Sequence, residues 1–236
     1  MTAALFLAFV ALIAITAGLM AARYLSRGIA TGILIGLPAW LVYVGLLAYF
    51  GVVRNTTLRP PGIVYVLLPV FVFVLVYVVR SEAGARAAFA IPLWALLAMQ
   101  VYRVGVEMFL HQLWKESLVP RMVTFEGANL DILIGATAPL IAWLATRGDR
   151  GLRLAFLWNL LGLLSLANVA TRSALTSPGP LRILHSDLPN LAIGMFPYTY
   201  IPGFLAPLAV VLHVLAIRSL RFTKQIASGR PRFMTA

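Results

Sequence analysis

The stretch AALFLAFVALIAITAGLMAA, Ala3 to Ala22, carries no charged side chain and indicates the solvent in which this chain folds. An apolar run of about 17 to 25 residues is long enough to cross the hydrocarbon core of a bilayer as one helix. The whole chain shares this character, because 61% of its 236 residues are hydrophobic, 11% are charged, and the mean hydropathy is +0.94. These values lie outside the range of soluble domains, so the sequence predicts a polytopic membrane protein.

Apolar runs of spanning length recur along the chain and predict an all-α bundle of about seven transmembrane helices. No positively charged leader precedes the first run, so we expect a retained helix and not a cleaved signal peptide. The bundle forms one predicted domain over residues 1–217, followed by a basic tail over residues 218–236. The predicted spans are Ala3–Ala22, Ile29–Gly51, Gly62–Val79, Phe89–His111, Leu130–Thr146, Leu154–Thr171 and Leu191–Ile217.

Lysine and arginine are distributed unequally between the two sides of these spans. Cytoplasmic loops carry the excess of basic residues, so the richer side is expected in the cytoplasm. The N-terminus is then outside and the C-terminus inside, and we expect a bacterial inner membrane. The cytoplasmic set is Arg23, Arg27, Arg80, Arg86, Arg147, Arg150, Arg153, Arg218, Arg221, Lys224, Arg230 and Arg232, and the smaller outer set is Arg54, Arg59, Lys115, Arg121, Arg172 and Arg182.

Composition and residue placement also exclude several functions. The formal net charge of +12 would suit nucleic acid, but the basic residues lie in short clusters between apolar segments, so no nucleic-acid partner is expected. The absence of cysteine excludes disulfides, thiolate metal sites and cysteine nucleophiles. A haem needs axial ligands at matching depth on facing helices. His111 and His213 are expected near opposite membrane faces and His185 in a loop, so haem is not expected.

The fourth predicted span contains an unusual polar stripe within QVYRVGVEMFLHQLWKE, residues 100–116. At 100° per residue, Gln100, Arg103, Glu107 and His111 fall within an arc of about 80° on one helix face. An ionised group at the bilayer centre costs at least about 2.5 to 3.5 kcal/mol, so this face is expected to meet the bundle interior or water. In the predicted orientation, Arg103 lies near mid-membrane and His111 close to the outer boundary.

Polar residues from three further segments are expected at the same outer level. One group lies at the start of the fifth span, a second at the end of the sixth span, and a third in the loop after the sixth span. Together they predict an outward-facing polar site. Glu107, His111 and Asp131 are the candidate catalytic residues, because carboxylate and imidazole groups can exchange protons. The candidate substrate-binding residues are Arg103, Glu126, Asn129, Asn168, Arg172, His185 and Asp187.

The one-sided polarity favours a protein that binds or processes a small amphiphilic or lipid-like molecule arriving from the membrane. A carboxylate and an imidazole at i and i+4 could also ligate a divalent metal, for which Glu107, His111 and His185 are the candidates. The spacing is unspecific, since EMFLH lacks the second histidine of a zinc-protease helix. The basic tail is expected to lie on anionic lipid.

Two other functions remain open. In a proton-coupled transporter, Arg103 and Glu107 would form a gate near the midplane, but the inner halves of the spans offer only scattered groups such as Gln100, Asn159 and His213. In a structural or assembly subunit, Arg103 and Glu107 would be an intrahelical ion pair without chemistry. For His213 we expect a hydrogen bond to a backbone carbonyl.

Overall fold

The computed structural model describes residues 1–179 and 182–227, and this part of the chain is helical and contains no strand. In a helix the backbone N–H and C=O groups bond to one another, and this is required in a bilayer because its core holds no water to bond them. The α-helices are α1 (Thr2–Tyr24), α2 (Arg27–Tyr49), α3 (Val64–Phe73), α4 (Glu82–Ala90), α5 (Leu93–Ala98), α6 (Tyr102–Lys115), α7 (Asp131–Leu144), α8 (Asp149–Thr176) and α9 (Ala206–Ala227). Shorter turns are the π-helical η1 (Val74–Arg80) and η5 (Ile201–Leu205) and the 3-10 turns η2 (Met99–Val101), η3 (Arg121–Val123) and η4 (Ala192–Gly194).

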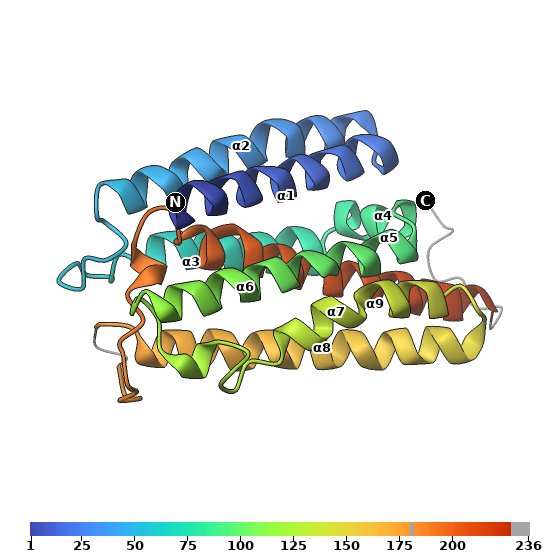
Figure 1. Cartoon of the computed structure of the whole chain (residues 1–236). Helices are drawn as coiled ribbons and strands as arrows, with labels where there is room; N and C mark the ends of the chain where they lie inside the picture. Colours follow the sequence, from blue (N-terminus) through green and yellow to red (C-terminus); the bar gives the residue numbers. More distant parts are fainter. Residues whose placement is uncertain (180–181, 228–236) are drawn as a thin grey trace.

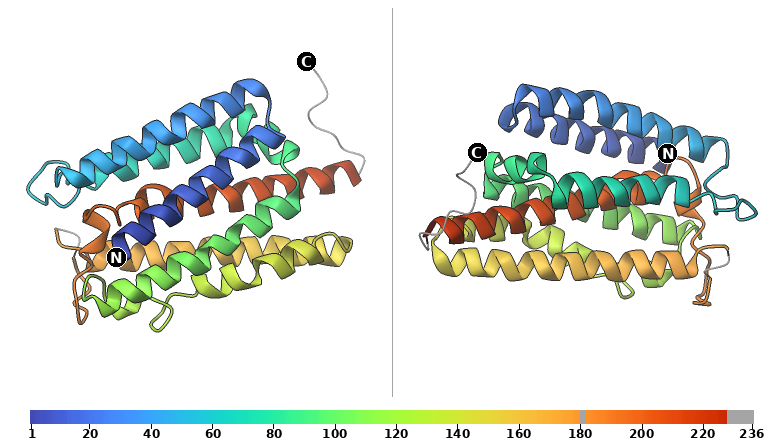
Figure 2. Two further views of the ribbon diagram at one scale, coloured as in Figure 1. Left: turned by 45° about the horizontal axis from the view of Figure 1, so that its top comes forward. Right: turned by 180° about the vertical axis from the view of Figure 1, so that it is seen from behind.

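The helices lie along one long axis, with the hairpin of α1 and α2 on one side and the hairpin of α7 and α8 on the opposite side (Figures 1 and 2). Between them, α6 contacts both α1 and α7, and α9 contacts α8, α4 and α5. The long loops before α3, before α7 and before η5 lie at the end of the bundle where α1 begins (Figure 1). Helices α6 and α9 therefore lie between the two hairpins and pack against α7 and α8.

Several helices are long and apolar enough to cross a membrane, which makes the chain a multi-pass membrane protein. Within the described residues, five segments meet the length and composition of a span, and a bent pair of helices brings the number to six. Helix α7 is apolar but has only 14 residues, fewer than the roughly 20 that a straight crossing requires. The five segments are Thr2–Tyr24, Arg27–Tyr49, Leu93–Lys115, Asp149–Thr176 and Ile201–Arg221.

The bent pair consists of Val64–Arg80 followed by Glu82–Ala90, with an angle of 71° between them. Ser81 is extended and caps α4 by accepting a hydrogen bond from the backbone N–H of Gly84 at 3.0 Å. The sequence predicted two separate spans here, Gly62–Val79 and Phe89–His111. Phe89 instead belongs to α4, and Pro92 separates α4 from α5, because the residue before a proline is held extended.

The last helix is displaced along the chain relative to its predicted range, Leu191–Ile217. Residues 191–199 form turns, and the continuous helix runs from Ile201 through η5 and α9 to Ala227. Arg218 and Arg221, assigned to the tail by the sequence, thus belong to α9. The tail residues Arg230 and Arg232 lie outside the described residues.

Candidate functional site

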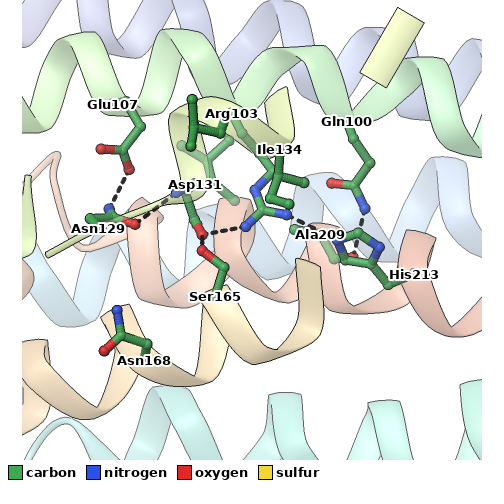
Figure 3. A network of polar contacts seen from close by, with 12 residues as sticks. Gln100, Arg103, Glu107, Asn129, Asp131, Ile134, Ser165, Asn168, Ala209 and His213 are labelled. Atoms are coloured by element: carbon green, nitrogen blue, oxygen red, sulfur yellow. Dashed lines mark hydrogen bonds and ion pairs between the residues drawn. The ribbon is translucent and has the colours of Figure 1, made fainter. Parts of the chain in front are cut away.

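Arg103 forms the centre of a buried polar network between α6, α7 and α9 (Figure 3). The residue is 2% exposed, its Nη2 lies 2.5 Å from Asp131 Oδ1, and its Nη1 lies 2.9 Å from His213 Nε2. Asp131 is the first residue of α7, and its Oδ1 also accepts a hydrogen bond from the Ser165 hydroxyl of α8. Arginine can donate in several directions at once, so Arg103 links α6 to α7 and α9, and Asp131 extends the network to α8.

His213 extends the network along α9 towards α8. It is fully buried, and its Nδ1 lies 2.7 Å from Asn159 Oδ1, while Asn159 Nδ2 donates to the carbonyl of Ala155 at 2.7 Å. Because a guanidinium can only donate, His213 Nε2 must accept from Arg103, which leaves the ring proton on Nδ1 to bind Asn159. The expected hydrogen bond from His213 to a backbone carbonyl was wrong, since both ring nitrogens contact side chains.

Glu107 lies one turn above Arg103 on α6 but is not its ion-pair partner. Asn129 Nδ2 donates to Glu107 Oε1 at 2.5 Å and to the carbonyl of Val123 at 3.0 Å, and Asn129 Oδ1 accepts from the backbone N–H of Asp131 at 3.0 Å. Among the described residues, Glu107 Oε2 has no hydrogen-bond partner. The intrahelical pair considered from the spacing of Arg103 and Glu107 was wrong, because Asp131 reaches Arg103 from α7.

Two glycines allow the helices to approach closely enough for these contacts. A Cβ atom on Gly135 of α7 would lie 2.8 Å from the backbone nitrogen of Val104 on α6, so no side chain fits there. A Cβ atom on Gly162 of α8 would overlap the imidazole of His213. Small residues at helix crossings permit such close packing in membrane proteins. The missing side chains at Gly135 and Gly162 therefore let the polar groups of neighbouring helices come within contact distance.

The outermost predicted residues lie apart from this network. His111 Nδ1 lies 3.5 Å from Glu126 Oε1, and the imidazole stacks on Phe125 with ring centroids 4.9 Å apart. His185 and Asp187 are exposed in the loop after α8. Within the described residues no three histidine or carboxylate side chains are grouped to hold a metal, so the metal candidates Glu107, His111 and His185 are not brought together.

Two predicted substrate-binding residues, Asn168 and Arg172 of α8, line an open pocket of about 480 Å³. Asn168 Nδ2 donates to the carbonyl of Ala128 at 2.7 Å, and Arg172 Nε donates to Asn168 Oδ1 at 2.8 Å. Both side chains are half-buried. The pocket thus presents a positive charge beside apolar walls. The full lining is Met122, Ala167, Asn168, Thr171, Arg172, Leu175 and Leu184.

Sequence reasoning missed Ser165 and treated Asn159 as an isolated group. Both residues lie on the buried face of α8 together with Gly162, at intervals of three residues. Residues three apart on a helix share a face, so the pattern of Asn159, Gly162 and Ser165 could have indicated a polar helix interface. Gln100 also belongs to the buried interior, because its Nε2 donates to the carbonyl of Ala209 at 3.1 Å (Figure 3).

Comparison with known families covers the part of the chain that holds this site. No curated protein and no solved structure matches the chain. Residues 60–221, well over half of the chain, match the model described as Domain of unknown function (DUF8737). The matched range contains the buried network and the pocket and leaves out α1 and α2. The chain therefore belongs to the DUF8737 family.

Proposed function

We propose that this protein binds a lipid-like amphiphile with an anionic headgroup in the pocket beside Arg172. The observation that carries the proposal is the composition of that pocket. A guanidinium, a carboxamide and a hydroxyl from α8 lie beside the apolar side chains of Met122, Leu175 and Leu184. An amphiphile matches both parts, since its headgroup can meet the polar groups while its chain stays against the apolar wall.

Arg172 is prepared for an anion by its neighbour. Asn168 fixes the orientation of the guanidinium by accepting its Nε–H, which leaves the two terminal nitrogens for another acceptor. No carboxylate of the described residues lies within ion-pair distance of Arg172. A guanidinium binds phosphate or carboxylate oxygens in a bidentate geometry, so a phosphodiester or fatty-acid headgroup is the expected ligand chemistry.

The proposed setting is a bacterial inner membrane crossed about seven times, with α7 as a short crossing. The N-terminus lies outside, in agreement with the excess of basic residues on the other side. In this orientation the end of α8 that carries Arg172 faces outward, at the same end of the bundle as the longer loops (Figure 1). The ligand would then enter from the outer leaflet.

Binding accounts for the geometry better than catalysis does. Glu107 and Asp131, two of the three candidate catalytic residues, are 1% and 7% exposed and do not line the pocket. His111 contacts Glu126 and Phe125 at the end of α6, also outside the pocket lining. We therefore assign the buried network the task of holding the helices and the loop before α7 in place below the ligand.

A second candidate function is proton-coupled transport, supported by the length of the network. Polar groups follow one another from Glu107 through Asn129, Asp131 and Arg103 to His213 and Asn159. From the sequence, Asn159 and His213 were expected to be scattered groups, which argued against transport. Intramembrane ionisable residues that form a continuous chain are typical of proton pathways.

The proposal is tested by identifying lipids that copurify with the protein in mild detergent, using native mass spectrometry. We expect the wild-type protein to retain a phosphodiester or carboxylate lipid, and Arg172→Gln to lose it. Arg153→Gln, on the same helix near its other end, is the matched control and should retain it. Equal retention of anionic lipid by both variants would exclude Arg172 as its ligand. Loss of the anionic lipid from both variants would show that it is held by general surface charge, which also contradicts the proposal.

A further inference from the structure

The loop of residues 117–130, here called the strap, connects the buried network to the pocket. Its Asn129 donates to Glu107 on α6, and the carbonyl of its Ala128 accepts from Asn168 on α8. Its Met122 forms part of the pocket wall. Since Asn168 also orients Arg172, one continuous path of contacts leads from a buried carboxyl to the cation of the pocket.

The strap is held against Glu107 in a way that suits an uncharged carboxyl group. Glu107 is 1% exposed, and among the described residues its Oε2 accepts no hydrogen bond, although the backbone N–H of Phe125 in the strap lies near the carboxyl group. An ionised carboxylate in that position would lack the partners that offset its loss of hydration. A proton on Oε2 removes the charge and leaves the hydrogen bond from Asn129 to Oε1 intact.

The charged groups around Glu107 do not supply the missing partner. Arg103, on the same helix, directs its guanidinium to Asp131 and His213. Asp131, at the start of α7, is a second acid in the same interior and repels a charge on Glu107. His111 is one turn above Glu107 and contacts Glu126 of the strap, so it does not reach Glu107 Oε2 as a donor.

Resting on the proposed function, we infer that Glu107 is a proton-binding site and that its protonation is coupled to occupancy of the Arg172 pocket. With the proton bound, the strap stays docked and the pocket is complete. When the proton leaves Oε2 for water, the charged carboxylate needs hydration, which requires the strap to move. Movement of the strap withdraws Met122 and the Ala128 carbonyl from α8, so affinity for the amphiphile falls as pH rises.

The test measures binding of phosphatidylglycerol carrying a fluorescent acyl chain to the protein in phosphatidylcholine nanodiscs between about pH 5.5 and 8.5. The phosphodiester of this probe keeps its charge across the range, so the ligand itself contributes no pH dependence. For the wild-type protein we expect affinity at low pH to exceed that at high pH by about fivefold or more, a common size for coupling between sites. Glu107→Gln, which resembles the protonated acid, should bind equally at every pH and at the low-pH strength of the wild type.

Glu116→Gln is the matched control, because Glu116 is an exposed carboxylate just before the strap and should leave the pH dependence unchanged. A wild-type pH dependence that persists in Glu107→Gln would overturn the coupling while leaving the proposed function intact. Absence of probe binding at every pH would contradict the proposed function itself. If Glu107→Gln fails to insert, proton uptake by the wild-type protein on adding the probe, followed with a pH dye in weak buffer, decides the matter. Net uptake supports the coupling, and its absence overturns it.

Discussion

The contact between Arg103 and Asp131 allows a quantitative test of the buried network. In Asp131→Leu, Arg103 stays buried at 2% exposure with His213 as its remaining side-chain partner among the described residues. In Arg103→Met, Asp131 keeps the Ser165 hydroxyl as its remaining side-chain partner among the described residues. Removing one partner of a buried ion pair costs about 3 to 5 kcal/mol, because the other charge is left without compensation. Each single variant should lose that much free energy of unfolding.

The double variant separates a stranded charge from a simple loss of packing. If the two losses were independent, they would add to about 6 to 10 kcal/mol. Replacing both partners removes both charges, so we expect the double variant to be no less stable than either single variant. The resulting coupling energy would be at least about 3 kcal/mol. This value is far above the 0.5 kcal/mol or so by which distant sites deviate from additivity.

Reversible unfolding in mixed micelles, followed by tryptophan fluorescence, supplies the four free energies of the cycle. The exposed pair of Glu82 and Arg86, 3.4 Å apart, is a control cycle in which the coupling should stay below about 0.5 kcal/mol. Losses that simply add in the buried cycle would refute the reasoning, since they would show that neither residue depends on the charge of the other.

Three further predictions concern single contacts. Gly162→Ala should lower the free energy of unfolding by about 1 to 3 kcal/mol, because the added methyl overlaps His213, and thermal unfolding in detergent measures the loss. Arg218→Gln should increase hydrogen exchange at the end of η1, since Arg218 donates to the carbonyls there; unchanged exchange would contradict this capping role. Hydrogen bonds from Thr2 and Gln112 lower the pKa of Glu116, so stability from this carboxylate is present above its unfolded pKa and is lost as pH falls through the folded value. Thr2→Val should therefore raise the pKa of Glu116 in an NMR titration.

The sequence predicted the helical membrane class and the polar face of α6 because both depend on local pattern. Apolar run length indicated the spans, and helical spacing placed Gln100, Arg103 and Glu107 together, which the structure confirms as buried. The partner of Arg103 could not be found in this way. Asp131 reaches it only because α7 begins at that residue and packs tightly on α6 through Gly135.

The position of His213 was misjudged for a different reason. An expected span of Leu191–Ile217 put His213 near the inner end of the last helix. The helix actually runs from Ile201 to Ala227, which moves His213 to its middle and to the level of Arg103. Apolar composition could not reveal this boundary, because residues 191–199 are mostly apolar and yet form turns against the bundle.

The break at Ser81 also has a consequence for how the chain is made. The carbonyls of Val78 and Val79 near the end of η1, and that of Ser81 just after it, accept hydrogen bonds from Arg218, which follows Val79 by 139 positions. A ribosome delivers Val79 to the membrane long before it has synthesised Arg218. Until α9 enters, these carbonyls must rely on interfacial water, so the crossing begun at Val64 cannot settle fully into the lipid. We therefore expect the helix that begins at Val64 to reach its final position only when α9 has been inserted, and a chain stalled before Arg218 would present an unfinished protein to the quality-control machinery of the membrane.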